Sequence, residues 1–212
     1  MTEDPYCIRA NNGAVPNNKN HLDQDDIKSL KSLNERRNDL LLYNHSGYSI
    51  NMQNFYQNSY AFLILSGPSL KNHDLSLLKH KRGIITMGVN NSWTIFKPNL
   101  WTSVDDPGNF HDIGWRDPSI MKFVPVSHIH KYIITKNYDG TFRKTSLRCQ
   151  DLASMWFFQR NLNFKAKTFF NEPSINWGAK DKHRCELGCK GSRSIMLVAL
   201  RLLHYLGFKR VF

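Results

Sequence analysis

The sequence predicts an α/β protein with a Rossmann-like, mostly parallel sheet, helices on both faces of that sheet, and a helical N-terminal extension. Two observations predict this fold. From residue 60 onward, short apolar runs alternate with helical patterns, which is typical of parallel strands joined by crossover helices. The runs are apolar almost throughout, as in strands that are buried on both faces. We therefore divide the chain into a tail with a helical extension, residues 1–59, and a Rossmann-like domain, residues 60–212.

The first segment begins with a tail that is rich in Asn, Pro and Gly and has no periodicity up to about residue 20. A helix follows, because Asp25 or Asp26 can cap it and Ile27, Leu30 and Leu33 share one face. Residues 44–60 predict a polar connector with scattered aromatic side chains.

The second segment contains the alternating elements. We expect strands and helices in the following order: strand 61–65, helical segment 70–79, strands 83–89, 99–104, 121–126, 131–135 and 166–170, helix 192–207, and strand 209–212. The last helix has an apolar stripe that includes Ile195, Val198 and Leu202, and it closes at Gly207. Because the strand after it has only just begun when the sequence stops, we expect the domain to be incomplete at its C-terminal side.

The composition is that of an ordered chain with an anionic partner. Hydrophobic residues make up 41% of the sequence and the net charge is +12, which indicates nucleic acid, nucleotide, phosphosugar or a membrane surface as partner. The basic residues are scattered, so an ordinary solvated surface also accounts for them. No run approaches the ~20 apolar residues of a membrane span, and no signal peptide is evident. We therefore expect a cytoplasmic protein with no membrane span and with reduced cysteines.

Small residues follow the first strand of the domain in the stretch "LSGPS". Gly67 allows a tight turn and a close approach of the backbone to a ligand, and Pro68 fixes the turn. Ser69 can cap the next helix and offer its hydroxyl to a phosphate. An ordinary strand-to-helix turn has the same composition, so this stretch alone leaves both interpretations open.

Polar residues also follow the next two strands. Asn90 and Asn91 can donate to and accept from a base edge or ribose hydroxyls, although a helix cap explains them equally well. Asp105 and Asp106 can bind a divalent ion or sugar hydroxyls, although Asp-Pro also initiates turns. In doubly wound sheets ligands bind beyond the carboxyl ends of the strands, so the three strand ends together predict a nucleotide site.

The stretches "LSGPSLKNHD", "MGVNNSW", "SVDD" and "GSRSIMLVALRLLHYLGFKRVF" resemble a known group of proteins. These are the bacterial lipooligosaccharide sialyltransferases that use CMP-sialic acid, together with the related family of flagellar motility accessory factors and archaeal-type hydroxymethylpterin diphosphokinases. The resemblance covers about 61–103 and 191–212. It implies a phosphate loop at Gly67, Pro68 and Ser69, and a nucleotide-contacting asparagine at Asn90. It also implies a strand-end acid at Asp105.

The resemblance further implies that the start of the last helix lines the nucleotide pocket, with Gly191, Ser192 and Ser194 as the residues concerned. Two departures stand out. The sialyltransferase loop begins with an additional Gly-Asn pair, where this chain has Leu65 and Ser66. The family's last strand continues into a Gly-x-Asp type segment, with the sialyltransferase general base beyond it, and this sequence stops before both.

The resemblance implies a transferase: a sialyltransferase-like glycosyltransferase that moves a sugar from a nucleotide-sugar donor, a CMP-sugar or another, to a glycan or other acceptor. One alternative is a magnesium-dependent diphosphokinase of the hydroxymethylpterin type, with Asp105 or Asp106 holding the ion. Another is a non-catalytic module that binds a nucleotide or nucleic acid. A transferase that modifies nucleic acid would combine a nucleotide pocket with a basic face.

Two other clusters are weaker candidates. His183, Cys185 and Cys189 could bind zinc, with Cys149 nearby, but their spacing is not the paired C-x-x-C pattern, so we expect no metal site. The five tryptophans could stack on single-stranded nucleic acid, but most lie beside apolar runs and are expected in the core. His111, His128 and His130 are expected to be exposed loop residues.

Overall fold

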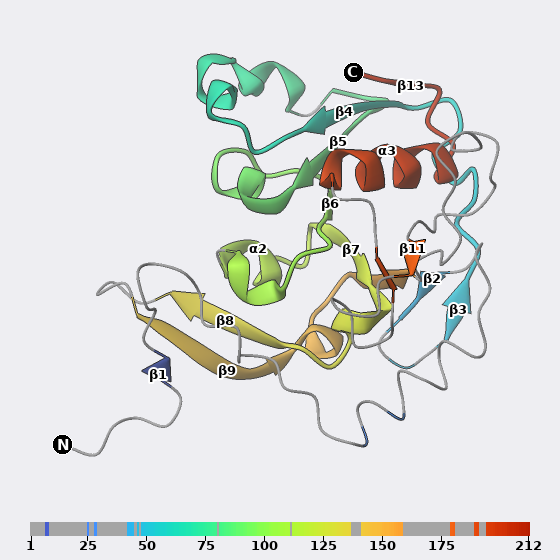
Figure 1. The fold of residues 1–212 in the computed structure, drawn as a ribbon. Coiled ribbons are helices and arrows are strands. Elements are labelled where there is room, and N and C mark those ends of the chain that lie inside the picture. Colours follow the sequence, from blue (N-terminus) through green and yellow to red (C-terminus); the bar gives the residue numbers. More distant parts are fainter. Residues whose placement is uncertain are drawn as a thin grey trace.

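The computed structural model describes residues 7–8, 25, 28, 42–44, 46, 48–79, 81–110, 112–136, 141–158, 179–180, 189–190 and 194–212. Its main feature is an eight-stranded sheet with the order β13-β4-β5-β6-β7-β10-β2-β3 (Figure 1). The strands from β13 to β10 are parallel, and β2 and β3 are antiparallel. The predicted α/β class with a mostly parallel sheet is therefore confirmed.

The strands of this sheet are short and largely buried. Their bounds are β2 Leu42–Tyr43, β3 Ser49–Ile50, β4 Tyr60–Ile64, β5 Ile84–Val89, β6 Leu100–Thr102, β7 Met121–Pro125, β10 Met155–Phe158 and β13 Arg210–Val211. The strands expected at 61–65, 83–89, 99–104, 121–126 and 209–212 all lie within one to three residues of these bounds. Apolar runs form central strands because both of their faces are covered.

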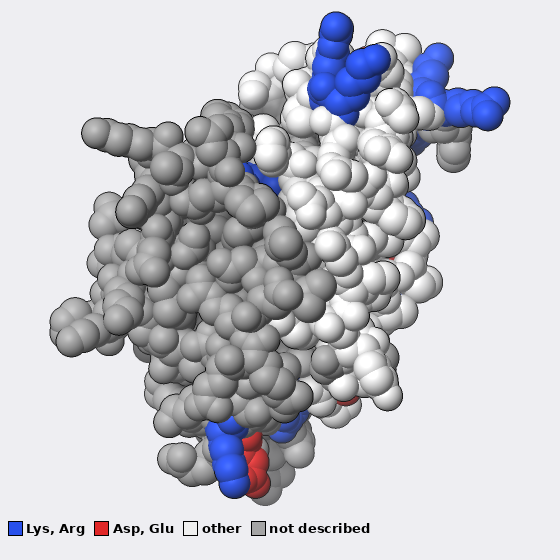
Figure 2. All heavy atoms as spheres, turned by 90° about the vertical axis from the view of Figure 1, so that its right-hand side faces the viewer, with Lys and Arg blue, Asp and Glu red and all other residues white. Residues whose placement is uncertain are grey.

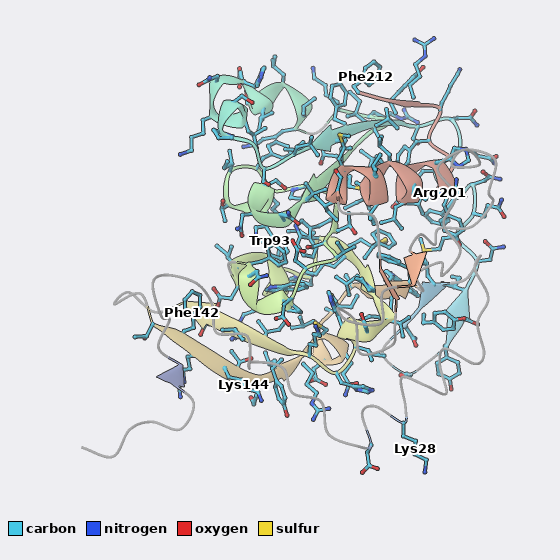
Figure 3. All side chains as sticks on the ribbon, viewed as in Figure 1. Lys28, Trp93, Phe142, Lys144, Arg201 and Phe212 are labelled. Atoms are coloured by element: carbon cyan, nitrogen blue, oxygen red, sulfur yellow. The ribbon has the colours of Figure 1, made fainter. Side chains whose placement is uncertain are left out.

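Helix α3 (Ile195–Tyr205) covers one face of the sheet. Val198 and Leu202 of this helix pack with Leu100 and Val89 of the strands. On the opposite face Trp101 packs with Trp93 of the 3₁₀ helix η4 (Asn90–Thr94) and with Trp115 of α2 (Ile113–Arg116). Figure 3 shows Trp93 against α2. Helices were predicted on both faces, and the described helical elements on the tryptophan face are only one or two turns long.

A second sheet departs from the prediction. β8 (Tyr132–Lys136) pairs antiparallel with β9 (Phe142–Arg148), and β9 pairs with β1 (Cys7–Ile8). The segment expected at 131–135 is thus a strand, but it lies outside the parallel sheet. The hairpin interrupts the chain between β7 and β10, which are neighbours in the main sheet. None of the β9 residues is fully buried, which suits a hairpin with one open face.

The helical turn or two expected at 70–79 is present, as 3₁₀ rather than α-helix. The structure has two 3₁₀ helices, η2 (Pro68–Asn72) and η3 (Leu75–Leu78). His73 is extended, with φ −107° and ψ 136°, and Asp74 then starts a new turn by accepting a hydrogen bond from the Ser76 backbone N–H at 3.0 Å. The side chain of Asp74 therefore competes with continuation of one helix.

The expected N-terminal helix falls mostly outside the described residues, of which Asp25 and Lys28 are helical and exposed. The connector predicted for residues 44–60 contains β3, and β2 lies at residues 42–43, the end of the stretch predicted as helix. β2 pairs with β10 and β3 pairs with β2, so both strands extend the main sheet. The strand expected at 166–170 lies outside the described residues, where β11 (Ala179–Lys180) and β12 (Cys189–Lys190) form a separate pair. Among the described helices, none has the length and apolar character needed to cross a membrane.

Candidate functional site

The carboxyl ends of β4, β5 and β6 form the edge at which the predicted site residues lie. From β4 the chain proceeds through β5, β6 and β7 in one direction across the sheet, while β13 lies on the other side of β4. The strand order therefore reverses beside β4. In open α/β sheets this reversal, at the carboxyl ends, is the place where ligands bind. The loop after β4 lies at this point, and the polar turns after β5 and β6 follow the next two strands of the sheet.

Asn90 is held at this edge by hydrogen bonds to both its backbone and its side chain. Its backbone is left-handed, with φ 50°, a conformation that asparagine tolerates better than most residues. The Asn90 carbonyl accepts a hydrogen bond from Trp101 Nε1 at 2.8 Å, and its side-chain Oδ1 accepts from Ser103 Oγ at 3.0 Å. These contacts leave the side-chain NH₂ of Asn90 free of any described partner, so it can donate to a ligand. Asn91 is exposed beside it.

Asp105 and Asp106 are placed differently. The Asp105 backbone N–H donates to Ser103 Oγ at 3.2 Å, and its exposed carboxylate has no hydrogen-bond or ion-pair partner among the described residues. The Asp106 side chain accepts from the Gly108 backbone N–H at 2.9 Å and forms an ion pair with Lys131 Nζ at 3.1 Å. Asp106 therefore holds the turn after β6, and Asp105 is the carboxylate that is available to a ligand.

The loop after β4 is open rather than tightly turned. Gly67 has φ −67° and ψ 154°, values that any residue can adopt, so the tight turn expected to require glycine is absent. Gly67, not Ser69, is the N-cap of η2, and Pro68 is its first residue. Ser69 is exposed, and its hydroxyl has no described partner. What remains of the prediction is an accessible backbone with a free hydroxyl, as phosphate binding needs.

The first turn of α3 completes the edge. The C-terminal end of this helix is anchored at the opposite, amino edge, where the Tyr56 backbone N–H donates to the Leu206 carbonyl at 2.8 Å. The N-terminus of α3 therefore points toward the carboxyl edge (Figure 1). Ser194 is exposed at the N-cap and makes no side-chain cap hydrogen bond. Gly191 and Ser192 lie outside the described residues.

Comparison of this chain with protein-family models, with curated proteins and with solved structures found no match. The resemblance to the sialyltransferase-like group therefore stays a prediction from the motifs. Two cavities of the described part lie away from the carboxyl edge: one of about 620 Å³ beside Asn44 and 150–156, and one of about 390 Å³ lined by Lys79, Lys97 and Asn99 among others.

Sequence reasoning missed two residues of the site. Ser103 connects Asn90 to Asp105, and Lys131 neutralises Asp106. The sequence offered a signal for Ser103, because it is the only hydroxyl residue between Thr102, where the strand ends, and the acidic pair. No pattern marked Lys131, because it lies 25 residues from Asp106 in sequence and reaches it through the turn before β8.

The zinc alternative gains no support from the described residues. Cys149 is wholly buried in the core, where burial strongly raises the pKa of its thiol. No group of three metal-ligating side chains occurs in the described part of the chain. His183 and Cys185 lie outside that part, as does the side chain of Cys189.

The other aromatic and imidazole predictions have mixed outcomes. Trp93, Trp101 and Trp115 are buried in the core, as expected. His128 is only 3% exposed, so the expectation of an exposed loop histidine is wrong for this residue. It lies in η6 (Val126–His128), directly after the buried strand β7, and is covered with it. His130 is partly buried and lies 3.0 Å from Gln150 Oε1 through its Nδ1 atom. His111 lies outside the described residues.

Proposed function

We propose that this chain is a Rossmann-like, nucleotide-dependent glycosyltransferase of the cytoplasm, which transfers a sugar from a nucleotide-sugar donor to a glycan or other acceptor. One observation carries the proposal: polar groups of Ser69, Asn90 and Asp105 that have no partner among the described residues follow three adjacent parallel strands, the first of which borders the reversal of strand order. Each group offers what one part of a nucleotide sugar requires. The sequence resemblance supports the same assignment.

The roles follow from the chemistry of each group. The Ser69 hydroxyl and the backbone N–H groups at the start of α3 bind the donor phosphate, because the helix N-terminus carries partial positive charge. The Asn90 NH₂ donates to the base or ribose. Asp105 accepts from sugar hydroxyls. Donors aimed at the phosphate stabilise the charge that develops as the sugar leaves, and Lys71 in η2 adds a cation on this side.

A second candidate function is magnesium-dependent diphosphoryl transfer, and the exposure of Asp105 favours it. Magnesium typically binds proteins through one or two carboxylates and otherwise through water and substrate phosphates. One free carboxylate at a phosphate-binding edge fits that requirement, whereas Asp106 is engaged by Lys131 and Gly108. When bound, the ion would neutralise charge on the transferred phosphates. Asp105 would hold it there.

A thermal-shift panel of CMP, UDP, GDP and ATP, each with magnesium or with EDTA, tests both candidates. A nucleotide at a hundred times its dissociation constant stabilises the folded chain by about 2.7 kcal/mol, which is readily detected. Glycosyl transfer predicts stabilisation by one pyrimidine or guanine nucleotide that persists in EDTA. Diphosphoryl transfer predicts stabilisation by ATP that requires magnesium and is lost in Asp105→Asn.

The matched variants are Ser69→Trp and Ser146→Trp. Both replace an exposed serine, but Ser146 lies on β9, away from the carboxyl edge. The proposal requires that the nucleotide effect be lost in Ser69→Trp and kept in Ser146→Trp. Absence of any shift with all four nucleotides, or equal shifts in both variants, would rule out a nucleotide site at this edge.

A further inference from the structure

The amino edge of the sheet, opposite to the candidate nucleotide site, carries a cluster of basic side chains. Lys209 donates its backbone N–H to the Ser59 carbonyl at 2.9 Å, and Tyr60 donates to the Gly83 carbonyl at 2.9 Å. The segment 81–83 and the segment 209–210 therefore flank the beginning of β4 on its two sides. Parallel neighbours are about 4.8 Å apart, so the two segments lie about 10 Å from each other.

Four basic side chains emerge from these segments: Lys81, Arg82, Lys209 and Arg210, which we call the basic edge. All four are exposed, and none forms an ion pair with a described residue. Figure 2 shows groups of Lys and Arg side chains at the top of the molecule, the end at which Figure 1 places β4 and β13. The acidic side chains seen in that view lie below them. No acidic side chain of the described residues therefore offsets the positive charge of the basic edge.

Exposed aromatic rings lie within the same region. Phe55 is 65% exposed and packs edge-on against Tyr56, with ring centroids 5.0 Å apart. Tyr56 in turn stacks on Phe208, also at 5.0 Å, and Phe208 directly precedes Lys209. Tyr60, between the two basic segments, is 36% exposed. The stacked rings of Tyr56 and Phe208 thus hold the exposed ring of Phe55 near the cations.

We propose that the basic edge binds single-stranded nucleic acid. The cations contact backbone phosphates, while Phe55 and Tyr60 offer ring faces on which bases can stack. This combination favours nucleic acid over a membrane surface, since interfacial binding typically uses an amphipathic helix, and here the cations lie on strand ends and turns. The site is separate from the carboxyl edge and does not depend on the function proposed for that edge.

Fluorescence anisotropy with a fluorescein-labelled oligothymidine, at salt concentrations from about 50 mM to 200 mM, tests this proposal. Four phosphate contacts predict a slope of about −2.8 for log K against log salt, which is a loss of about 50-fold in affinity over that range. Lys81→Glu with Arg82→Glu should reduce the slope by about 1.4, and so should Lys209→Glu with Arg210→Glu. The two pairs are tested separately, so that a folding defect in one leaves the other informative.

The control pair is Lys28→Glu with Arg143→Glu, which changes the net charge by the same amount. Both residues are exposed, and Figure 3 shows Lys28 and the neighbours of Arg143 at the end of the molecule opposite to Phe212. The control should retain the wild-type slope. Equal losses in all three double variants would show that overall charge, not the basic edge, drives binding. Failure to bind the oligothymidine at about 50 mM salt, or binding only to phosphatidylserine vesicles, would overturn the proposal.

Discussion

Gly67 occupies a position where nothing in the described part of the chain requires glycine. Its φ and ψ are those of an ordinary extended residue, and an added Cβ would meet only Ser69 Oγ, at 3.9 Å. The contacts of the described residues therefore leave room for a reason that comes from a ligand. A ligand whose phosphate approaches the backbone closely is such a reason.

The variant Gly67→Ala tests this explanation. The substitution should leave the free energy of unfolding unchanged or raise it by about 0.4–1 kcal/mol, because alanine restricts the unfolded chain. Nucleotide binding should weaken at least about tenfold if the new methyl group costs 1.4 kcal/mol or more of contact with the phosphate. Urea denaturation and nucleotide titration measure the two effects. A stable variant with wild-type nucleotide affinity would remove the phosphate-loop role of Gly67.

Lys122 is a second residue with an unusual environment. It is wholly buried at the start of β7, and its Nζ donates to the carbonyls of Asp117 at 2.7 Å, Ile120 at 3.0 Å and Ala153 at 3.3 Å. Burial lowers its pKa to about 8, although nearby Asp117 acts in the opposite direction. The ammonium group joins the loop before β7 to the loop before β10, so it fixes the spacing of these two strands.

We expect Lys122→Met to destabilise the fold by about 1–3 kcal/mol at pH 7, since three buried carbonyls lose their donor. Between pH 8 and pH 10 the unfolded wild type holds this proton and the folded wild type does not, so wild-type stability rises with pH. The stability difference between wild type and variant should therefore widen across that window. Urea denaturation at several pH values measures it. If the stability difference between wild type and variant narrows as pH rises, then burial does not lower the pKa of the Lys122 ammonium group.

At the level of elements, the contact between η4 and α2 depends on Gly114. A Cβ at this position would overlap the ring of Trp93, which is itself stacked on Trp101 with centroids 4.1 Å apart. The ring cannot move away without disturbing that stack. The two short helices of the tryptophan face thus approach each other only because one residue has no side chain.

Gly114→Ala should accordingly cost about 1–3 kcal/mol through overpacking and should alter the near-ultraviolet circular dichroism of the tryptophans. Gly67→Ala, where the added methyl group meets open space, is the matched control for the same chemical change. The expected result is a shifted aromatic signal in the first variant only. Wild-type stability and spectrum in Gly114→Ala would show that α2 can move away at little cost.

The same elements show how much of the structure can be predicted from the sequence. β4, β5, β6 and β7 were predictable because each is an apolar run that stops at a polar turn. β10 was not predicted, because Met155–Phe158 is short and pairs with β7 only across the inserted hairpin. The helical turn or two predicted at 70–79 is present, but the sequence did not show that the segment divides at Asp74, whose side chain caps a new turn. Local patterns thus identify strands, and they do not identify insertions or competing caps.

The candidate site likewise has features that the sequence predicts and features that it does not. The strand-end residues Ser69, Asn90 and Asp105 were predictable, because the carboxyl ends of parallel strands meet at one edge. The difference between Asp105 and Asp106 was not, since it depends on Lys131, which is remote in sequence. The extended conformation of Gly67 was not predictable from the sequence either, because small residues permit both tight and extended backbones.

At the scale of the whole molecule, one sheet separates two packed clusters. Leu202 lies in the cluster under α3, whereas Trp101 belongs to the cluster on the opposite face, and both clusters include residues from β6 and β7. Since the strands are shared, neither cluster can be lost while the other stays intact. We therefore expect the two faces to unfold in one transition.

Leu202→Ala tests this coupling. The substitution removes a fully buried side chain and should destabilise the fold by about 2–5 kcal/mol. The urea midpoint should fall equally when it is followed by far-ultraviolet circular dichroism and by the near-ultraviolet signal of the tryptophan cluster. Separate midpoints would show that the α3 face can open while the tryptophan face remains folded.

The strand order also bears on the order of events during folding. The central strands β4 to β7 are neighbours in sequence as well as in the sheet, but β13 pairs with β4 across nearly all of residues 60–212, and β10 reaches β7 across the hairpin insertion. Closing long loops costs entropy that short connections avoid. We expect pulse-labelled amide exchange to show early protection in β5 and β6 and late protection in β13. Nascent chains that have not yet acquired β13 would then expose the side of β4, a strand edge open to pairing with other molecules.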